Sequence, residues 1–180
     1  MKSADEVVNY VNSQTTKSQY LSSERKADQI SDLSAFSHGV PSFIRFGCEN
    51  SGVDINKYDK SDFGMLEAGK FLKNAFLPNK SQVDLFSCNA ATPIQNLRLD
   101  FRTEASLIQT SLKLPNLVNS LSVSTGATVT GYIGRTDYSS SGNGQLPSGG
   151  KTGGDYSPTV RGNPVPSIKV TSKNGKNKAN

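Results

Sequence analysis

The chain is short of the residues that build metal centres and disulfide frameworks. Its 180 residues include two cysteines, one histidine and no tryptophan. Two thiols are too few for a disulfide framework, and their spacing matches no zinc signature. With a single imidazole, a cluster of metal ligands is not expected. The sequence therefore predicts a protein without a metal ion or other cofactor.

Long apolar runs are also missing. No apolar segment approaches the roughly 18 residues needed to span a bilayer. The N-terminus, "MKSADEVVNYVNS", lacks the apolar stretch of a signal peptide. We therefore expect no membrane span and no export signal carried by the chain itself. Such a chain would be secreted as part of a larger protein, or delivered by a partner into the cytoplasm of a target cell.

The positive charge is unevenly distributed. The formal net charge is +5, and much of the excess lies in "IKVTSKNGKNKAN" at the C-terminus, which contains no acidic residue. A solvated basic tail explains this charge better than a nucleic-acid groove, which would interleave basic and aromatic residues on one face. The sequence thus predicts no specific nucleic-acid partner and a disordered C-terminal end.

The first three quarters of the chain alternate between strand-like and helix-like segments. A capping box, Ser3 to Glu6, precedes a short amphipathic helix. The pattern then predicts strands at 29–39, 82–88 and 127–134, and helices at 62–76, 103–114 and 115–126. Because the crossovers are long enough for parallel pairing, this order favours a three-layer α/β/α sandwich with a mostly parallel sheet.

A change of composition divides the chain. Residues 1–135 make up the predicted α/β domain. Residues 136–180 are Gly/Ser-rich and then basic, and the Gly/Ser-rich part cannot pack a core. We expect this C-terminal segment to be mostly irregular, with one strand at 166–172.

Two chemically competent residues lie at the carboxyl ends of two of the expected strands: His38 in "FSHG" and Cys88 in "DLFSCNAAT". Open α/β sheets bind ligands beyond the carboxyl ends of their strands, so both side chains would lie at one edge. An imidazole there can take the thiol proton, and the thiolate attacks. Gly39 would offer its N–H to an oxyanion, as would the N–H of Cys88. Asn89 and Ala90 would leave room for an extended peptide.

Each residue also has a structural explanation on its own. His38 could be a histidine at a strand end, and Cys88 a buried thiol. The catalytic interpretation depends on the pair, because the histidine precedes the cysteine by 50 positions, which is the caspase order and spacing. Cys48 has no second motif beside it, and we expect it to be structural.

"FSHG" followed by "VDLFSCNAAT" resembles the paired motifs of the caspase-like cysteine peptidases, and most closely the bacterial caspase-like and CHAT-type domains of large secreted proteins. The resemblance covers about Ile30 to Tyr132. It implies a caspase–haemoglobinase fold, His38 as general base and acid, Cys88 as nucleophile and Gly39 in the oxyanion hole.

The same resemblance implies a protein or peptide substrate. It further suggests the effector domain of a bacterial toxin, with a delivery or immunity partner. One departure is plain: the family's sheet usually begins with a strand and a helix before the histidine segment, and only 29 residues precede Ile30. The alternative is a catalytically inactive module that keeps the fold and binds a protein.

Overall fold

A five-stranded mixed sheet forms the centre of the protein. The computed structural model describes residues 3–40, 42–45, 62–96, 99–134, 158–165 and 167–180. The strands lie in the order β1 (Asp32–Phe36), β5 (Gln82–Phe86), β7 (Thr128–Ile133), β10 (Ile168–Lys173) and β11 (Lys176–Ala179). The first three are parallel, and β10 and β11 are antiparallel to their neighbours. The predicted α/β class with a mostly parallel sheet is therefore confirmed.

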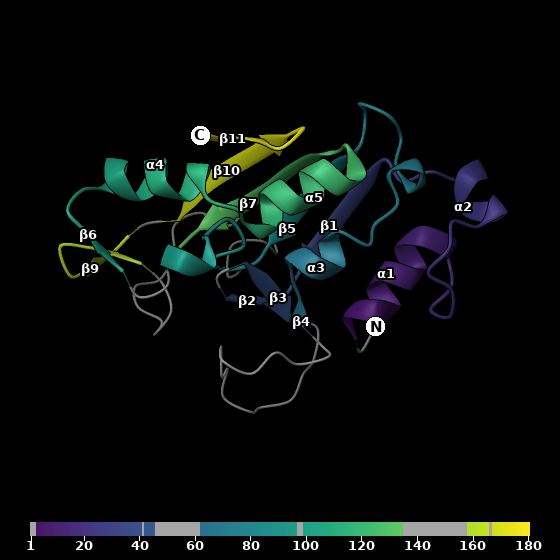
Figure 1. Ribbon diagram of the computed structural model, residues 1–180, viewed down its shortest axis with the longest axis horizontal. Helices are drawn as coiled ribbons and strands as arrows, with labels where there is room; N and C mark the ends of the chain where they lie inside the picture. Colours follow the sequence, from purple (N-terminus) through teal and green to yellow (C-terminus); the bar gives the residue numbers. More distant parts are fainter. Residues whose placement is uncertain (1–2, 41, 46–61, 97–98, 135–157, 166) are drawn as a thin grey trace, which may run out of the picture.

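Helices cover one face of this sheet (Figure 1). The described helices are α1 (Ala4–Ser13), α2 (Ser23–Ala27), α3 (Met65–Ala68), α4 (Glu104–Lys113) and α5 (Leu117–Thr125), with short 3-10 turns η1 (Lys73–Ala75) and η2 (Ile94–Asn96). Helix α5 packs on β7 and β10, and α4 packs on β11. In β5, Val83 and Leu85 are buried on the face covered by helices, whereas Gln82 on the other face is exposed. Among the described residues, the helices that contact the sheet make one layer, and a second layer of the expected sandwich stays a prediction.

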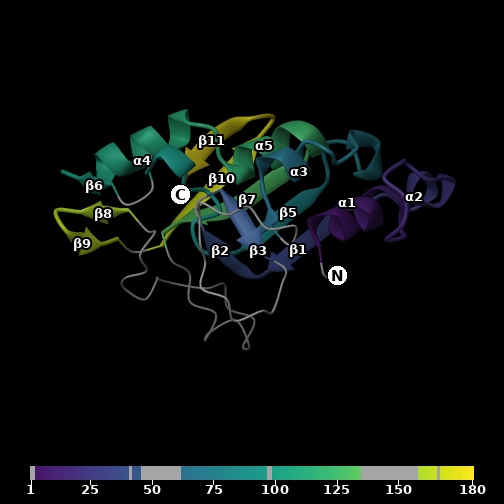
Figure 2. The same cartoon turned by 60° about the horizontal axis from the view of Figure 1, so that its bottom comes forward.

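Two small sheets flank the central one. The first is antiparallel and contains β2 (His38–Val40), β3 (Phe43–Arg45) and β4 (Asp62–Phe63). It follows directly from the carboxyl end of β1 (Figure 2). The second contains β6 (Asp100–Phe101), β8 (Thr159–Val160) and β9 (Asn163–Pro164). The position of the first small sheet matters most, because it begins with the histidine.

Local capping explains where the longer helices begin and end. Ser3 accepts a hydrogen bond from the Glu6 N–H at 3.3 Å and starts α1 as predicted. Thr103 caps α4 in the same way. Helix α5 ends at Gly126, whose φ of 72° is the left-handed conformation expected of a C-terminal glycine.

The helix predicted over 62–76 is mostly wrong. Only the four residues of α3 are α-helical, followed by the 3-10 turn η1. The buried Asn12 side chain explains the interruption, because its Nδ2 donates to the Lys70 carbonyl at 2.9 Å and its Oδ1 accepts from the Leu72 N–H at 2.9 Å. These backbone groups therefore pair with α1 rather than with a continuing helix.

The disordered C-terminal end was also predicted wrongly. The strand expected at 166–172 exists as β10, and the chain then turns back as β11. Asn174 and Gly175, with φ of 50° and 76°, form the turn, a residue pair that strongly favours tight hairpins. The Gly175 N–H also donates to Ser122 of α5 at 3.1 Å. Residues 136–157 of the Gly/Ser-rich part lie outside the described residues.

Candidate functional site

Backbone pairing brings His38 and Cys88 to the same edge of the sheet. The parallel pairing of β1 with β5 joins each residue to the one 50 positions later, as in Phe36 with Phe86 (86 − 36 = 50). The interval between His38 and Cys88 is the same. The pairing continues past the strands, because the Ser37 N–H donates to the Phe86 carbonyl at 3.4 Å. The two backbones therefore leave neighbouring strands side by side.

Gly39 lies against the backbone of Cys88. A Cβ atom at Gly39 would collide with the Cys88 carbonyl oxygen and would lie 2.8 Å from the Ser87 hydroxyl. The Ser87 hydroxyl in turn donates to the Ser37 carbonyl at 2.9 Å. Packing alone thus requires glycine here, and the same packing holds the Gly39 backbone next to the candidate nucleophile.

The thiol of Cys88 is half-buried and takes part in no disulfide. It follows β5 directly, at the carboxyl end of a parallel strand. The backbone of His38 is described, whereas its imidazole and the whole of Cys48 lie outside the described part of the chain. The distance from the sulfur to the imidazole accordingly stays a prediction.

Asn89 stabilises the turn that follows Cys88. Its φ is 58°, its N–H donates to the Gly134 carbonyl at 2.7 Å, and its side-chain oxygen accepts from the Gly134 N–H at 3.1 Å and the Thr92 hydroxyl at 3.1 Å. Asn89 is only 4% exposed and Ala90 is 0% exposed. The side chains of both residues therefore contribute to the turn and the core. They do not line an open cleft, contrary to the expectation from sequence.

The β2–β3 connection is hydrogen-bonded to the same turn. The buried Ser42 donates its N–H to the Asn89 carbonyl at 3.3 Å and its hydroxyl to the Thr92 carbonyl at 3.0 Å. Sequence analysis missed Ser42, Thr92 and Gly134. The one local signal was the Asn of "CNAAT", since asparagine readily turns the chain and bonds to the backbone a few residues on.

A tyrosine and an acid lie near one another on the face of the sheet opposite the helices. Burial raises the pKa of Tyr132, and the Asp84 carboxylate raises it further. Within the described residues, no group of three or more His, Cys, Asp or Glu side chains is arranged to hold a metal ion.

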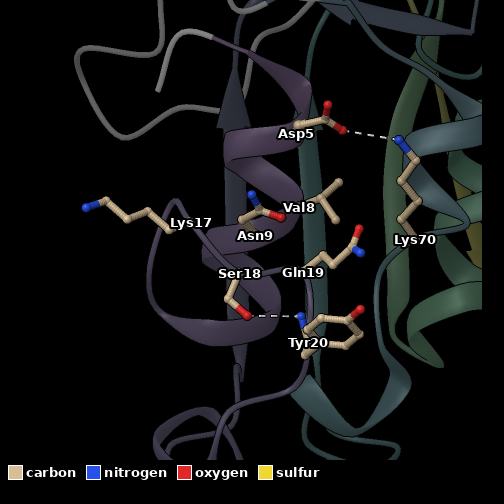
Figure 3. Close-up of a pocket in the computed structure, with 8 residues that line it drawn as sticks. All are labelled: Asp5, Val8, Asn9, Lys17, Ser18, Gln19, Tyr20 and Lys70. Atoms are coloured by element: carbon tan, nitrogen blue, oxygen red, sulfur yellow. Dashed lines mark hydrogen bonds and ion pairs between the residues drawn. The ribbon is translucent and has the colours of Figure 1, made fainter.

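A separate pocket lies beside α1, with a volume of about 450 Å³ (Figure 3). Its lining comes from α1, the loop after it and the turn after α3: Asp5, Val8, Asn9, Lys17, Ser18, Gln19, Tyr20 and Lys70. The Lys70 ammonium and the Asp5 carboxylate pair at 3.1 Å. None of the candidate catalytic residues lines this pocket, and the lining does not identify a ligand.

No family model, curated protein or solved structure matches the chain. None of the described helices is long and apolar enough to cross a membrane.

Proposed function

We propose that the protein is a caspase-like cysteine endopeptidase in which Cys88 is the nucleophile and His38 the general base and acid. One observation carries the proposal: β1 and β5 pair in parallel with a 50-residue register, and the same 50 residues separate His38 from Cys88. Because of that pairing, the backbones of His38 and Cys88 follow the carboxyl ends of two neighbouring parallel strands, where sheets of this class bind ligands.

The reaction follows from the two side chains. The His38 imidazole takes the proton of the Cys88 thiol, and the thiolate attacks the carbonyl carbon of the scissile peptide bond. The C–N bond then breaks, the imidazolium returns its proton to the leaving amine, and a thioester remains on Cys88. Water, activated by the same imidazole, hydrolyses the thioester and releases the carboxylic acid and the thiol.

Gly39 would stabilise the oxyanion of each tetrahedral intermediate. In β2–β3 the pairs are Val40 with Phe43, next to the turn, and Gly39 with Ile44. In a two-residue hairpin the pair next to the turn exchanges hydrogen bonds and the following pair does not. By this pattern the Gly39 N–H is directed away from β3, and its packing against Cys88 keeps it close to the reacting carbon.

The caspase–haemoglobinase fold is part of the same proposal. The parallel order β1, β5, β7, with histidine after the first strand and cysteine after the second, supports it. Two family features are not met within the described residues: a strand on the outer side of β1 and a second helical layer.

Substitution of the two residues tests the proposal. Cys88→Ala and His38→Ala should each lower the cleavage of fluorescein-labelled casein by at least about 100-fold, because each removes an essential participant. Cys48→Ser is the matched control and should cleave at the wild-type rate. Wild-type activity in the Cys88→Ala protein, or an inactive but folded Cys48→Ser protein, would contradict the assignment.

Thiol labelling separates the peptidase from an inactive binding module. A peptidyl chloromethylketone should modify Cys88 faster than Cys48, and His38→Ala should slow the reaction at Cys88 only. A binding module without a working dyad would give equal labelling rates with and without His38. Peptide mass mapping of the modified protein measures both sites in one experiment.

A further inference from the structure

The two edges of the central sheet differ in chemistry. Figure 1 shows β1 at one edge and β11 at the other. The β11 edge carries exposed Lys176 and Lys178, and lysines on an edge strand discourage pairing with another chain. The β1 edge has no lysine, no proline and no bulge, and no strand among the described residues pairs with its outer side. It is the edge open to strand addition.

The hydrogen bonds between β1 and β5 determine which backbone groups of β1 point outward. The Ser31 carbonyl accepts from the Gln82 N–H at 2.7 Å, and the Ser37 N–H donates to the Phe86 carbonyl at 3.4 Å. Backbone N–H and C=O groups alternate in direction along a strand. The N–H and C=O groups of the odd-numbered residues of β1 therefore point to β5. The N–H and C=O groups of the even-numbered residues, Asp32, Ser34 and Phe36, therefore point away from the sheet.

The side chains of these three residues define the partner's chemistry. All three are exposed, and the Phe36 ring, 61% exposed, stacks on Phe86 with centroids 4.4 Å apart. Asp32 lies at the start of β1 and Asp84 in the neighbouring β5, and neither forms an ion pair within the described residues. This corner is acidic although the chain has a net charge of +5.

Leu33 and Ala35 occupy the face covered by helices and are only half-buried, whereas Val83 and Leu85 beside them on β5 are fully buried. An added strand would therefore gain by placing aliphatic side chains next to Leu33 and Ala35. From the outward backbone groups, the aliphatic inner face and the acidic outer corner, we propose that the β1 edge binds an extended peptide segment as an additional strand. The side chains of the bound segment would alternate between aliphatic and polar, with a basic residue beside Asp32.

A defined probe tests this proposal without any assumption about catalysis. The probe is fluorescein-labelled Lys-Val-Thr-Val-Lys-Val-Thr, and the measurement is fluorescence anisotropy against the full chain. The matched probe has Glu in place of each Lys and should bind at least about tenfold more weakly, because it meets Asp32 and Asp84 with like charge. Equal binding of the two peptides, or no binding of the lysine peptide, would overturn the proposal.

The variant Ser34→Pro tests how much the outward backbone N–H groups of β1 contribute to peptide binding. Proline removes an N–H that points outward and leaves the pairing of β1 with β5 intact, as proline on edge strands commonly does. The variant should bind the lysine peptide at least about tenfold more weakly, whereas Ser34→Ala, which keeps the N–H, should bind within about twofold of wild type. Circular dichroism checks that both variants are folded. Wild-type affinity in a folded Ser34→Pro protein would contradict strand addition.

N-methylated probes keep the test decisive if Ser34→Pro does not fold. One probe is methylated on the backbone nitrogens of its Val residues, the other on those of its Lys and Thr residues. An added strand uses one set of N–H groups only, so one probe should lose binding and the other should keep it. In an antiparallel complex the Lys and Thr set is used, and in a parallel complex the Val set. If both probes bind like the parent peptide, the proposal fails.

Discussion

At the scale of single residues, the site depends most on Asn89. Its side chain supports the turn after Cys88 through Gly134 and Thr92, and its backbone adopts a left-handed conformation that alanine disfavours. Asn89→Ala should lower the free energy of unfolding by about 2–3 kcal/mol, through backbone strain and lost hydrogen bonds. Asn89→Gly relieves the strain and should cost less. Urea unfolding of both variants measures the difference, and equal losses would show that the strain is unimportant.

Tyr132 gives the protein a specific response to alkaline pH. Its pKa is raised above the ordinary value of 10.0 in the folded protein, by burial and then by Asp84. In the window above pH 10 the unfolded chain loses this proton while the folded protein retains it, so stability is full below that pH and falls as pH rises. Tyr132→Phe should flatten the decline in stability above about pH 10, measured as the urea concentration at the midpoint of unfolding. If the urea midpoint of the Tyr132→Phe protein falls with pH as steeply as that of the wild type, this role of Tyr132 is contradicted.

At the scale of elements, the C-terminal hairpin depends on its glycine. Gly175 has a φ of 76°, and a Cβ there would lie 2.8 Å from the Val123 side chain of α5. Gly162 has a similar φ of 73° with open space around it, which makes it a matched control. Gly162→Ala should cost about 1 kcal/mol from backbone strain alone. Gly175→Ala should cost about 2–3 kcal/mol, because strain and steric overlap add. Equal thermal melting of the two variants would show that the turn is not held on α5.

Elements defined by local signals could be predicted from sequence, and those that depend on distant partners could not. The cap at Ser3 and the helix end at Gly126 lie within one turn of the helices that they delimit, and the sequence predicts both positions. The break in 62–76 depends on Asn12, about 60 residues earlier in the chain, and no local pattern reveals it. The hairpin at Asn174 has a local signal, the Asn-Gly pair. The basic composition of the segment nevertheless favoured the prediction of a disordered end.

The same distinction applies to the candidate site. The placement of His38 and Cys88 at one sheet edge followed from strand order alone, and the register of β1 with β5 agrees with it. The inward role of Asn89 did not follow, because it requires Gly134 at the end of a third strand. A single short motif could not show that contact.

At the scale of the whole molecule, the last strands complete the central sheet. Strand β10 pairs with β7 along all six of its residues, and its Ile168 and Val170 are buried in the main core. Strand β11 lies at the outer edge and contributes four pairs to β10. The two strands therefore contribute unequally to stability, although the sequence places both in one basic segment.

Two truncations separate these contributions. A chain ending at Lys173 loses only the edge strand and should stay folded with reduced stability. A chain ending at Pro166 loses two buried aliphatic side chains, worth about 1.5–3 kcal/mol each, and exposes the long edge of β7 to solvent. It should therefore lose cooperative unfolding and aggregate. Thermal denaturation followed by circular dichroism distinguishes the two chains. If the shorter chain melts within about 2 °C of the full-length protein, the segment is an appendage, as its composition alone predicted, and the central sheet is stable with three strands.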